Sequence, residues 1–283
     1  MSVSRTLLVI CAALGLCATR AIARPLAGDH VRVELVSEKN AFVPGQRTWL
    51  ALRLTHEPHW HTYWINPGDS GLPTKLRWEL PPEFKAGDIV WPTPRRLEVG
   101  GLYNFGYEGR TLLPVAIDVP ADARMGSTVH VALEAKWLVC REECIPGKAM
   151  LKLALPVARS AAPYSRWQRT FAAARALQPA AAAWSGSARL DGNRIEVALR
   201  GEALPQADQL DAFPVQARVV GYAPPKVSRR ADGLSLVFDK SEYFAAIPTA
   251  FDLLIVDRKP AAIARARTVS VPFTIAGTPA ATP

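Results

Sequence analysis

Alternation of apolar and polar residues dominates the first half of the chain and predicts β-strands. Turn-forming clusters such as Asn66-Pro67-Gly68-Asp69 separate the alternating runs. The runs are His30–Leu35, Trp49–Leu54, Leu112–Ile117, Val129–Leu133 and Leu151–Leu155. Several short strands at this spacing are typical of an antiparallel sandwich. We therefore expect a first β-domain over residues 24–158.

The pattern changes after residue 158. Trp167, Phe171 and Ala174 lie at helical spacing within Tyr164–Leu177, which predicts one amphipathic helix ended by Pro179. Residues 159–183 are thus expected to be helix and linker, with Ala180–Ala183 as linker. Strand patterns resume at Ile195–Leu199, Ala217–Val220, Leu234–Phe238, Asp252–Val256 and Val269–Ile275. They predict a second β-domain over residues 184–276, followed by a disordered tail over 277–283.

The amino-terminal segment has the pattern of a secretory signal peptide over residues 1–23. Arg5 gives a basic start, Leu7–Thr19 is apolar, and Ala21-Ile22-Ala23 provides a cleavage site after Ala23. No later apolar run approaches the roughly 20 residues that span a bilayer. We expect an exported protein that does not itself span the membrane and that resides in an oxidising compartment.

Charge and motif content narrow the function further. The formal net charge of +9 falls to +7 when Arg5 and Arg20 leave with the signal. The sequence has no basic stripe with interleaved aromatic residues, which argues against a nucleic-acid partner. Asn66–Gly71 is neither a phosphate-binding loop nor a calcium loop, and turn chemistry accounts for it. We expect no cofactor.

The two cysteines of the mature chain, Cys140 and Cys144, are the main candidates for chemistry, since Cys11 and Cys17 lie in the signal. Positions four apart in a continuous strand are about 13 Å apart, beyond the roughly 7 Å limit for a disulfide. The chain must therefore turn over residues 141–143 at a strand end if the two are bonded. Such a small ring stabilises the fold by only about 2 kcal/mol. A passive bridge, a redox-active pair and a metal clamp all remain open.

A histidine pair offers the metal alternative. His59 and His61 would lie on the same side of a strand and could bind copper together with Cys140 and Cys144. The other interpretation is that these histidines pack among neighbouring aromatic side chains at a sheet edge. Those neighbours are Trp60, Tyr63 and Trp64.

Three separated blocks carry a family resemblance. They are Trp137-Leu138-Val139-Cys140 with Cys144-Ile145-Pro146, then His59–Pro73, and Gly100–Gly109. Together they resemble the amino-terminal periplasmic domains of DsbD-type thiol:disulfide interchange proteins. The closer similarity is to the suppressor-of-copper-sensitivity (ScsB-like) branch. Residues 160–276 resemble the second, immunoglobulin-like region of the same relatives.

The resemblance implies an all-β fold of two immunoglobulin-like antiparallel β-sandwich domains joined by a short helical segment. It implies a redox-active Cys140–Cys144 disulfide that takes electrons from a membrane-embedded thiol donor, encoded separately here. The implied recipients are periplasmic thioredoxin-fold clients and the cytochrome c maturation pathway. By analogy, Cys144 would form the intermolecular bond.

The resemblance also implies a cap loop that shields the cysteines, which by position would contain Tyr103, Phe105 and Tyr107. Asp69 and Glu108 could tune the thiols. Two other functions stay open beside the relay. One is a copper-binding, copper-tolerance protein that uses the same cysteines, and the other is a structural adaptor with a passive disulfide.

Overall fold

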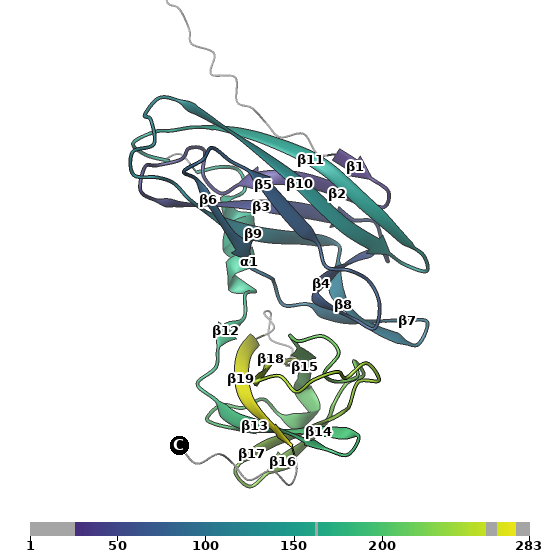
Figure 1. Cartoon of the computed structure of the whole chain (residues 1–283). Helices are drawn as coiled ribbons and strands as arrows, with labels where there is room; N and C mark the ends of the chain where they lie inside the picture. Colours follow the sequence, from purple (N-terminus) through teal and green to yellow (C-terminus); the bar gives the residue numbers. More distant parts are fainter. Residues whose placement is uncertain (1–25, 162–163, 259–264, 276–283) are drawn as a thin grey trace, which may run out of the picture.

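The computed structural model describes residues 26–161, 164–258 and 265–275 (Figure 1). The expected signal peptide, its cleavage site and the tail lie outside these residues. Strands make up most of the described chain, with one α-helix between two β-sandwiches. This is the fold class that the sequence predicts.

The first sandwich has two antiparallel sheets. One has the strand order β1-β2-β3-β9-β6, and the other has the order β11-β10-β4-β8-β7, with β5 paired to β10. The first sheet contains β1 (Leu26–Gly28), β2 (Val31–Ser37), β3 (Arg47–His56), β6 (Lys85–Ile89) and β9 (Arg110–Asp118). The second contains β4 (His61–Gly68), β5 (Lys75–Glu79), β7 (Arg95–Val99), β8 (Leu102–Glu108), β10 (Thr128–Cys140) and β11 (Cys144–Pro156).

Side-chain alternation builds the core of this sandwich. Leu52 and Leu54 of β3 face Val131 and Leu133 of β10 within one buried cluster, and each of these side chains is at most 1% exposed. Strand β2 departs from simple alternation, because Val36 on its other face is also only 1% exposed. The reason is that a further element covers that face.

That element is helix α1 (Gln168–Ala176). Phe171 is 1% exposed and forms a small apolar cluster with Val36, Ala51 and Leu112 of the first sheet. Ion pairs fix both ends of this contact: Arg166 binds Glu34 at 3.1 Å, and Arg175 binds Glu38. The helix starts four residues later than Tyr164 and ends one residue before Leu177, and its buried face is the one predicted.

The second sandwich continues from the helix as the strand order β15-β18-β19-β13-β14-β17-β16. Its strands are β12 (Ala180–Ala181), β13 (Ser185–Asp191), β14 (Arg194–Arg200), β15 (Leu210–Pro214), β16 (Lys226–Arg230), β17 (Gly233–Asp239), β18 (Ala250–Asp257) and β19 (Arg265–Ile275), with a 3₁₀ turn at Ala207–Gln209. Strand β19 pairs with β18 on one side and with β13 on the other, which joins the two layers.

Three details of the second sandwich differ from expectation. Ala217–Val220 is not a strand: Arg218 has a φ of 64°, and its N–H donates to the Tyr222 hydroxyl at 2.9 Å, which closes a turn. Ala180–Ala181 is not free linker, because it pairs with β19. The β12–β19 and β13–β19 pairings are parallel. We propose that the two domains comprise residues 24–158 and 184–276, and that residues 159–183 connect them.

The two sandwiches meet at the β7–β8 hairpin of the first (Figure 1). The Phe105 ring lies 5.0 Å from the Phe213 ring and 5.4 Å from the Tyr222 ring. The Arg96 guanidinium lies over Phe105 and Phe213, and donates to Asp211 and to the main-chain carbonyl of Ala212, each at 2.8 Å. These contacts hold β8 in place against the second sandwich.

Candidate functional site

The cysteines close the end of the longest hairpin. Strands β10 and β11 pair over 13 residues each, and the final pair in the register is Cys140 with Cys144. The two are joined by a disulfide, with their Cα atoms 4.2 Å apart. The chain turns over residues 141–143, where the Arg141 N–H donates to the Glu143 carbonyl at 3.1 Å. A strand-end turn is thus what brings the sulfurs together.

The two cysteines differ in accessibility. Cys140 is 2% exposed, whereas Cys144 is exposed. In the sheet, Cys140 is paired with His61 of β4, so their side chains are neighbours on one face. Cys144 is therefore the cysteine that a partner molecule can approach from the surface.

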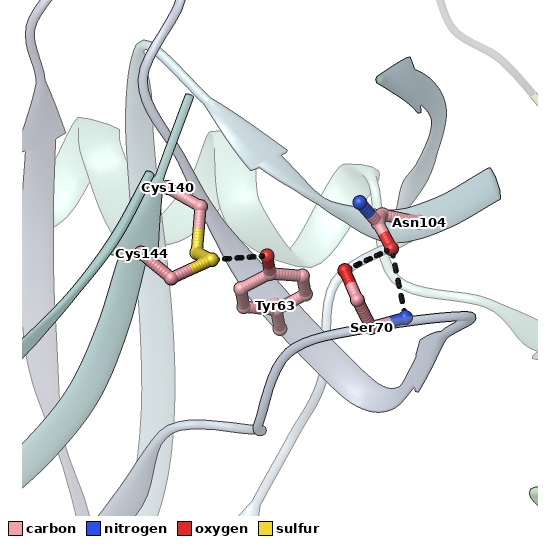
Figure 2. The surroundings of a disulfide bond; sticks show 5 residues. All are labelled: Tyr63, Ser70, Asn104, Cys140 and Cys144. Carbon is pink, nitrogen blue, oxygen red and sulfur yellow. Dashed lines mark hydrogen bonds between the residues drawn. A yellow bond between two sulfur atoms is a disulfide. The ribbon is translucent and has the colours of Figure 1, made fainter. Parts of the chain in front are cut away.

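Tyr63 of β4 contacts the exposed cysteine from inside the protein. Its hydroxyl oxygen lies 3.6 Å from Sγ of Cys144 (Figure 2). A disulfide sulfur carries no hydrogen, so in this state the phenol O–H is the donor. Tyr63 is 1% exposed, and burial raises the pKa of its phenol. The hydroxyl therefore keeps its proton at neutral pH.

A short loop after β4 holds the Tyr63 ring in place. Gly71 has a φ of 92°, and a Cβ at this position would lie 2.2 Å from Cζ of Tyr63. Ser70 donates its main-chain N–H and its hydroxyl to Oδ1 of Asn104, at 3.1 and 3.0 Å. Figure 2 shows Tyr63 between the disulfide and this Ser70–Asn104 pair. Only glycine allows the loop to approach the ring this closely.

The segment expected to be a cap loop is a strand. Tyr103, Phe105 and Tyr107 belong to β8, which pairs with β4 on one side and with β7 on the other. Gly106 permits close packing of β8 against β4, since a Cβ there would lie 2.1 Å from the Thr62 carbonyl oxygen. Phe105 is fully buried at the domain interface.

The other members of this segment have their own partners. The Tyr107 hydroxyl donates to the Pro92 carbonyl at 2.8 Å, and the Tyr103 N–H donates to Asp69 at 2.7 Å. Glu108 forms an ion pair with Arg95 at 2.7 Å. Within the described parts of the chain, no hydrogen bond links Asp69 or Glu108 to a cysteine sulfur. Their tuning role and the gating role of the segment stay predictions.

The histidines do not lie as the sequence predicts. His59 is exposed in the turn before β4 with a φ of 70°, so it does not share a strand face with His61. His61 is 2% exposed, and its Nε2 has no hydrogen-bond partner among the described residues. Burial lowers the pKa of His61 and that of His56 to about 4. Within the described ranges, no group of three or more His, Cys, Asp or Glu side chains is placed to hold a metal ion.

Comparison with known families is decisive at this point. Residues 32–156 match the family described as "Thiol:disulfide interchange protein DsbD, N-terminal". The first sandwich is a DsbD-type N-terminal domain. The match runs from the second residue of β2 to the end of β11, and thus includes the cysteine hairpin, Tyr63 and the loop that holds it. The family and the Cys140–Cys144 disulfide together support thiol–disulfide exchange at this domain.

One solved structure shares the fold of this chain. The N-terminal periplasmic domain of ScsB from Proteus mirabilis aligns over 88% of this chain and 97% of its own, at 19% identity and a TM-score of 0.66. A protein of unknown function from Porphyromonas gingivalis W83 aligns over 86% and 99%, at 14% identity, but its TM-score of 0.25 is too low to support an argument. A comparison with curated proteins found no match.

The geometry adds residues that the sequence did not single out. Tyr63 was one member of an aromatic cluster, Ser70 and Gly71 belonged to a segment explained by turn chemistry, and Asn104 had no assigned role. Tyr63 and Cys144 are 81 residues apart, and no local pattern links them. No helix in the described part of the chain is long and apolar enough to cross a membrane.

Proposed function

We propose that this chain is an exported thiol–disulfide exchange component that relays electrons through Cys140 and Cys144. The observation that carries the proposal is a disulfide at the tip of a hairpin in a DsbD-type domain, with one cysteine exposed and the other buried. The bridge joins residues only four positions apart, so it closes a small ring and constrains little of the chain. Such a bridge fits a reactive role better than a structural one.

The exposure difference favours Cys144 as the sulfur that partners attack. A donor thiolate forms a bond to Sγ of Cys144, the Cys140–Cys144 bond breaks, and Cys140 leaves as a thiolate that takes a proton from water. A second thiolate of the donor then attacks the donor's own sulfur in the mixed disulfide. The donor becomes a disulfide, and Cys144 is released with both electrons now in the Cys140/Cys144 dithiol.

Reduction of a client repeats these steps in reverse. The Cys144 thiolate attacks a client disulfide, and one client sulfur leaves as a thiolate that takes up a proton. Cys140, next to Cys144 in the hairpin register, then attacks Cys144 and releases the reduced client. The domain returns to the disulfide state. In this scheme the chain acts as a protein-disulfide reductase component.

Partners and location follow from the family. We infer a periplasmic location, a membrane-embedded thiol donor encoded separately, and thioredoxin-fold clients or the cytochrome c maturation pathway as recipients. The DsbD-type family match supports this inference, as does the periplasmic origin of the structurally similar ScsB domain.

We also propose that Tyr103, Phe105 and Tyr107 gate access to the disulfide. The packing of Phe105 restricts how this strand can move. Because Phe105 is buried against Phe213 and Tyr222, any swing of this strand requires the domain interface to open. The second sandwich would then regulate access to the cysteines as well as position partners.

The function is tested by trapping exchange partners with the full mature chain. The probe is a thioredoxin-fold protein without its resolving cysteine, loaded as a mixed disulfide with thionitrobenzoate, so that each exchange releases a coloured thiol. The Cys140→Ser variant should form a stable mixed disulfide through Cys144. Cys144→Ser should react at least tenfold more slowly, because its remaining thiol is buried. Equal rates for the two variants would contradict the assignment of Cys144.

The reduction potential separates the relay from a structural adaptor. In metal-free thiol–disulfide buffers, the relay requires a value well above about −300 mV, whereas a lower value would indicate a structural disulfide. Copper handling makes a different prediction: the reduced chain would bind copper stoichiometrically, and both Cys144→Ser and His61→Ala would abolish the binding.

A further inference from the structure

We propose that Tyr63 is a catalytic hydrogen-bond donor that stabilises the Cys144 thiolate during exchange. The proposal rests on the function proposed above, in which Cys144 is the sulfur that meets partners. It concerns a residue of β4 that touches the reacting atom from the side opposite to the solvent. A partner approaching from outside therefore meets a sulfur that is already hydrogen-bonded from within.

The contact is direct, and Tyr63 approaches the more reactive of the two sulfurs. Oη of Tyr63 lies 3.6 Å from Sγ of Cys144 (Figure 2). The other cysteine, Cys140, is paired with His61 in the strand register. The rings of His61 and Tyr63 pack edge to face, with 5.2 Å between their centroids. The phenol thus contacts the sulfur of the exposed cysteine.

The phenol is held where a thiolate would form. The Tyr63 ring is bounded by the Gly71 backbone and by His61, and the loop that carries Gly71 is bonded to Asn104 through Ser70. Cys144 is fixed by the hairpin register, which is unbroken from Thr128 to Cys140. When the disulfide opens, the Cys144 sulfur can move only by rotation about the Cα–Cβ bond. The donor and the acceptor therefore stay within reach in the reduced state.

The protonation state of Tyr63 suits a donor. Burial disfavours the phenolate and raises its pKa, so the hydroxyl keeps its proton while a thiol nearby ionises. A hydrogen bond to a charged sulfur is stronger than one to a neutral sulfur. The interaction consequently favours the thiolate over both the thiol and the disulfide. It raises the thiolate fraction at neutral pH, and it stabilises the charge that develops on Cys144 when this sulfur is the leaving group.

The chemical step leaves the Tyr63 proton on oxygen. As the Cys144 thiolate attacks a client disulfide, a new S–S bond forms, the client S–S bond breaks, and the departing client thiolate is protonated by water. In the reverse direction, Cys144 is the leaving group, and the Tyr63 O–H donates a hydrogen bond to the negatively charged Cys144 sulfur. No additional oxidant or reductant is needed, because the electrons pass between the two dithiol–disulfide couples.

The test measures the Cys144 thiol itself and needs no client. In the full mature Cys140→Ser chain, the rate of alkylation by iodoacetamide is followed against pH, with and without Tyr63→Phe. We expect the midpoint of the profile to rise by about one unit, a tenfold loss of thiolate at neutral pH. Because a more basic thiolate is intrinsically more nucleophilic, the net loss of rate at pH 7 should be about threefold.

Tyr222→Phe is the matched control. It removes another buried tyrosine hydroxyl, one in the second sandwich that accepts from the Arg218 N–H, and it keeps the ring that packs on Phe105. The proposal predicts an unchanged midpoint for Tyr222→Phe. Gly71→Ala keeps the Tyr63 hydroxyl but displaces its ring, so it should raise the midpoint in the same direction as Tyr63→Phe.

Either of two results would overturn the role of Tyr63: an unchanged midpoint in Tyr63→Phe, or equal shifts in Tyr63→Phe and Tyr222→Phe. These results are independent of whether a client is ever reduced. If the client assay fails while the midpoint shifts as expected, the proposed relay is wrong but the contact between Tyr63 and the Cys144 thiolate is real.

Discussion

Arg96 of the DsbD-type domain and Asp211 of the second sandwich form an ion pair that is almost entirely withdrawn from solvent. The Arg96 Nη2 and Asp211 Oδ1 atoms are 2.8 Å apart, and the two side chains are 6% and 3% exposed. The guanidinium also lies over the rings of Phe105 and Phe213. Two sheets that are far apart in the sequence are thus joined by one arginine.

Removal of this arginine should loosen the interface. Arg96→Ala leaves Asp211 buried with only Arg258 as an ionic partner, and we expect a loss of about 3 kcal/mol in the free energy of unfolding. Urea denaturation gives this value. Arg95→Ala is the neighbouring control: its ion pair with Glu108 is 70% exposed on the arginine side, so it should cost at most about 1 kcal/mol. Similar losses in both variants would contradict the importance of the interface.

The loop that holds Tyr63 should be sensitive at Gly71. In Gly71→Ala, a left-handed backbone and a 2.2 Å contact with the Tyr63 ring act together, and we expect destabilisation of about 2–4 kcal/mol. Gly109→Ala provides the comparison, because Gly109 has a φ of 65° but nothing within 4 Å of an added Cβ. It should cost about 1 kcal/mol from backbone strain alone. Thermal unfolding of both variants measures the difference that is due to the ring.

Acid should destabilise the protein through two buried histidines. The pKa values of His56 and His61 are lowered from 6.5 to about 4 in the folded state, mainly by burial, so the unfolded chain binds more protons between these values. Stability is therefore complete above pH 6.5 and is lost as pH falls toward 4. At pH 4.5, each histidine should lower the free energy of unfolding by about 2–3 kcal/mol relative to neutral pH.

Unfolding in urea from pH 7.5 to 4.5 tests this dependence. His61→Gln should reduce the slope of stability against pH, whereas His130→Gln, at an exposed position of β10, should leave it unchanged. A stability that stays constant over this range would show that the two histidines are not buried as neutral side chains.

Reduction of the disulfide should leave the domain folded. A ring closed by residues four positions apart stabilises the fold by about 2 kcal/mol in the chain-entropy account. We expect the Cys140→Ser/Cys144→Ser variant and the reduced wild type to lose no more than this amount, as denaturation with and without a reductant would measure. A loss above about 4 kcal/mol would instead indicate a structural bridge.

The sequence was informative wherever local geometry decides the structure. The reach of a strand required a turn between Cys140 and Cys144, and the spacing of Trp167, Phe171 and Ala174 identified the buried face of α1. The same reasoning was wrong for Ala217–Val220, where the Tyr222 hydroxyl closes a turn inside an apolar run. Alternation alone could not distinguish a strand from a buried turn there.

Long-range contacts account for the other differences. The environment of Phe105 depends on Phe213 and Tyr222, more than a hundred residues later in the chain. Its neighbour Gly106 could be interpreted as a loop residue or as a close strand contact, and only the position of Thr62 decides between them. The pairing of Tyr63 with Cys144 likewise depends on how β4 meets β10.

The two sandwiches share one buried cluster of apolar side chains, and this determines how the molecule unfolds. Phe213, Tyr222 and Leu254 of the second sandwich belong to the same buried cluster as Leu52 and Val131 of the DsbD-type domain. Cutting the chain between the sandwiches would uncover Phe105 and leave Arg96 without its acceptors. We therefore expect the two sandwiches to unfold in a single cooperative calorimetric transition. A substitution that destabilises the second sandwich should then also lower the melting temperature of the DsbD-type domain.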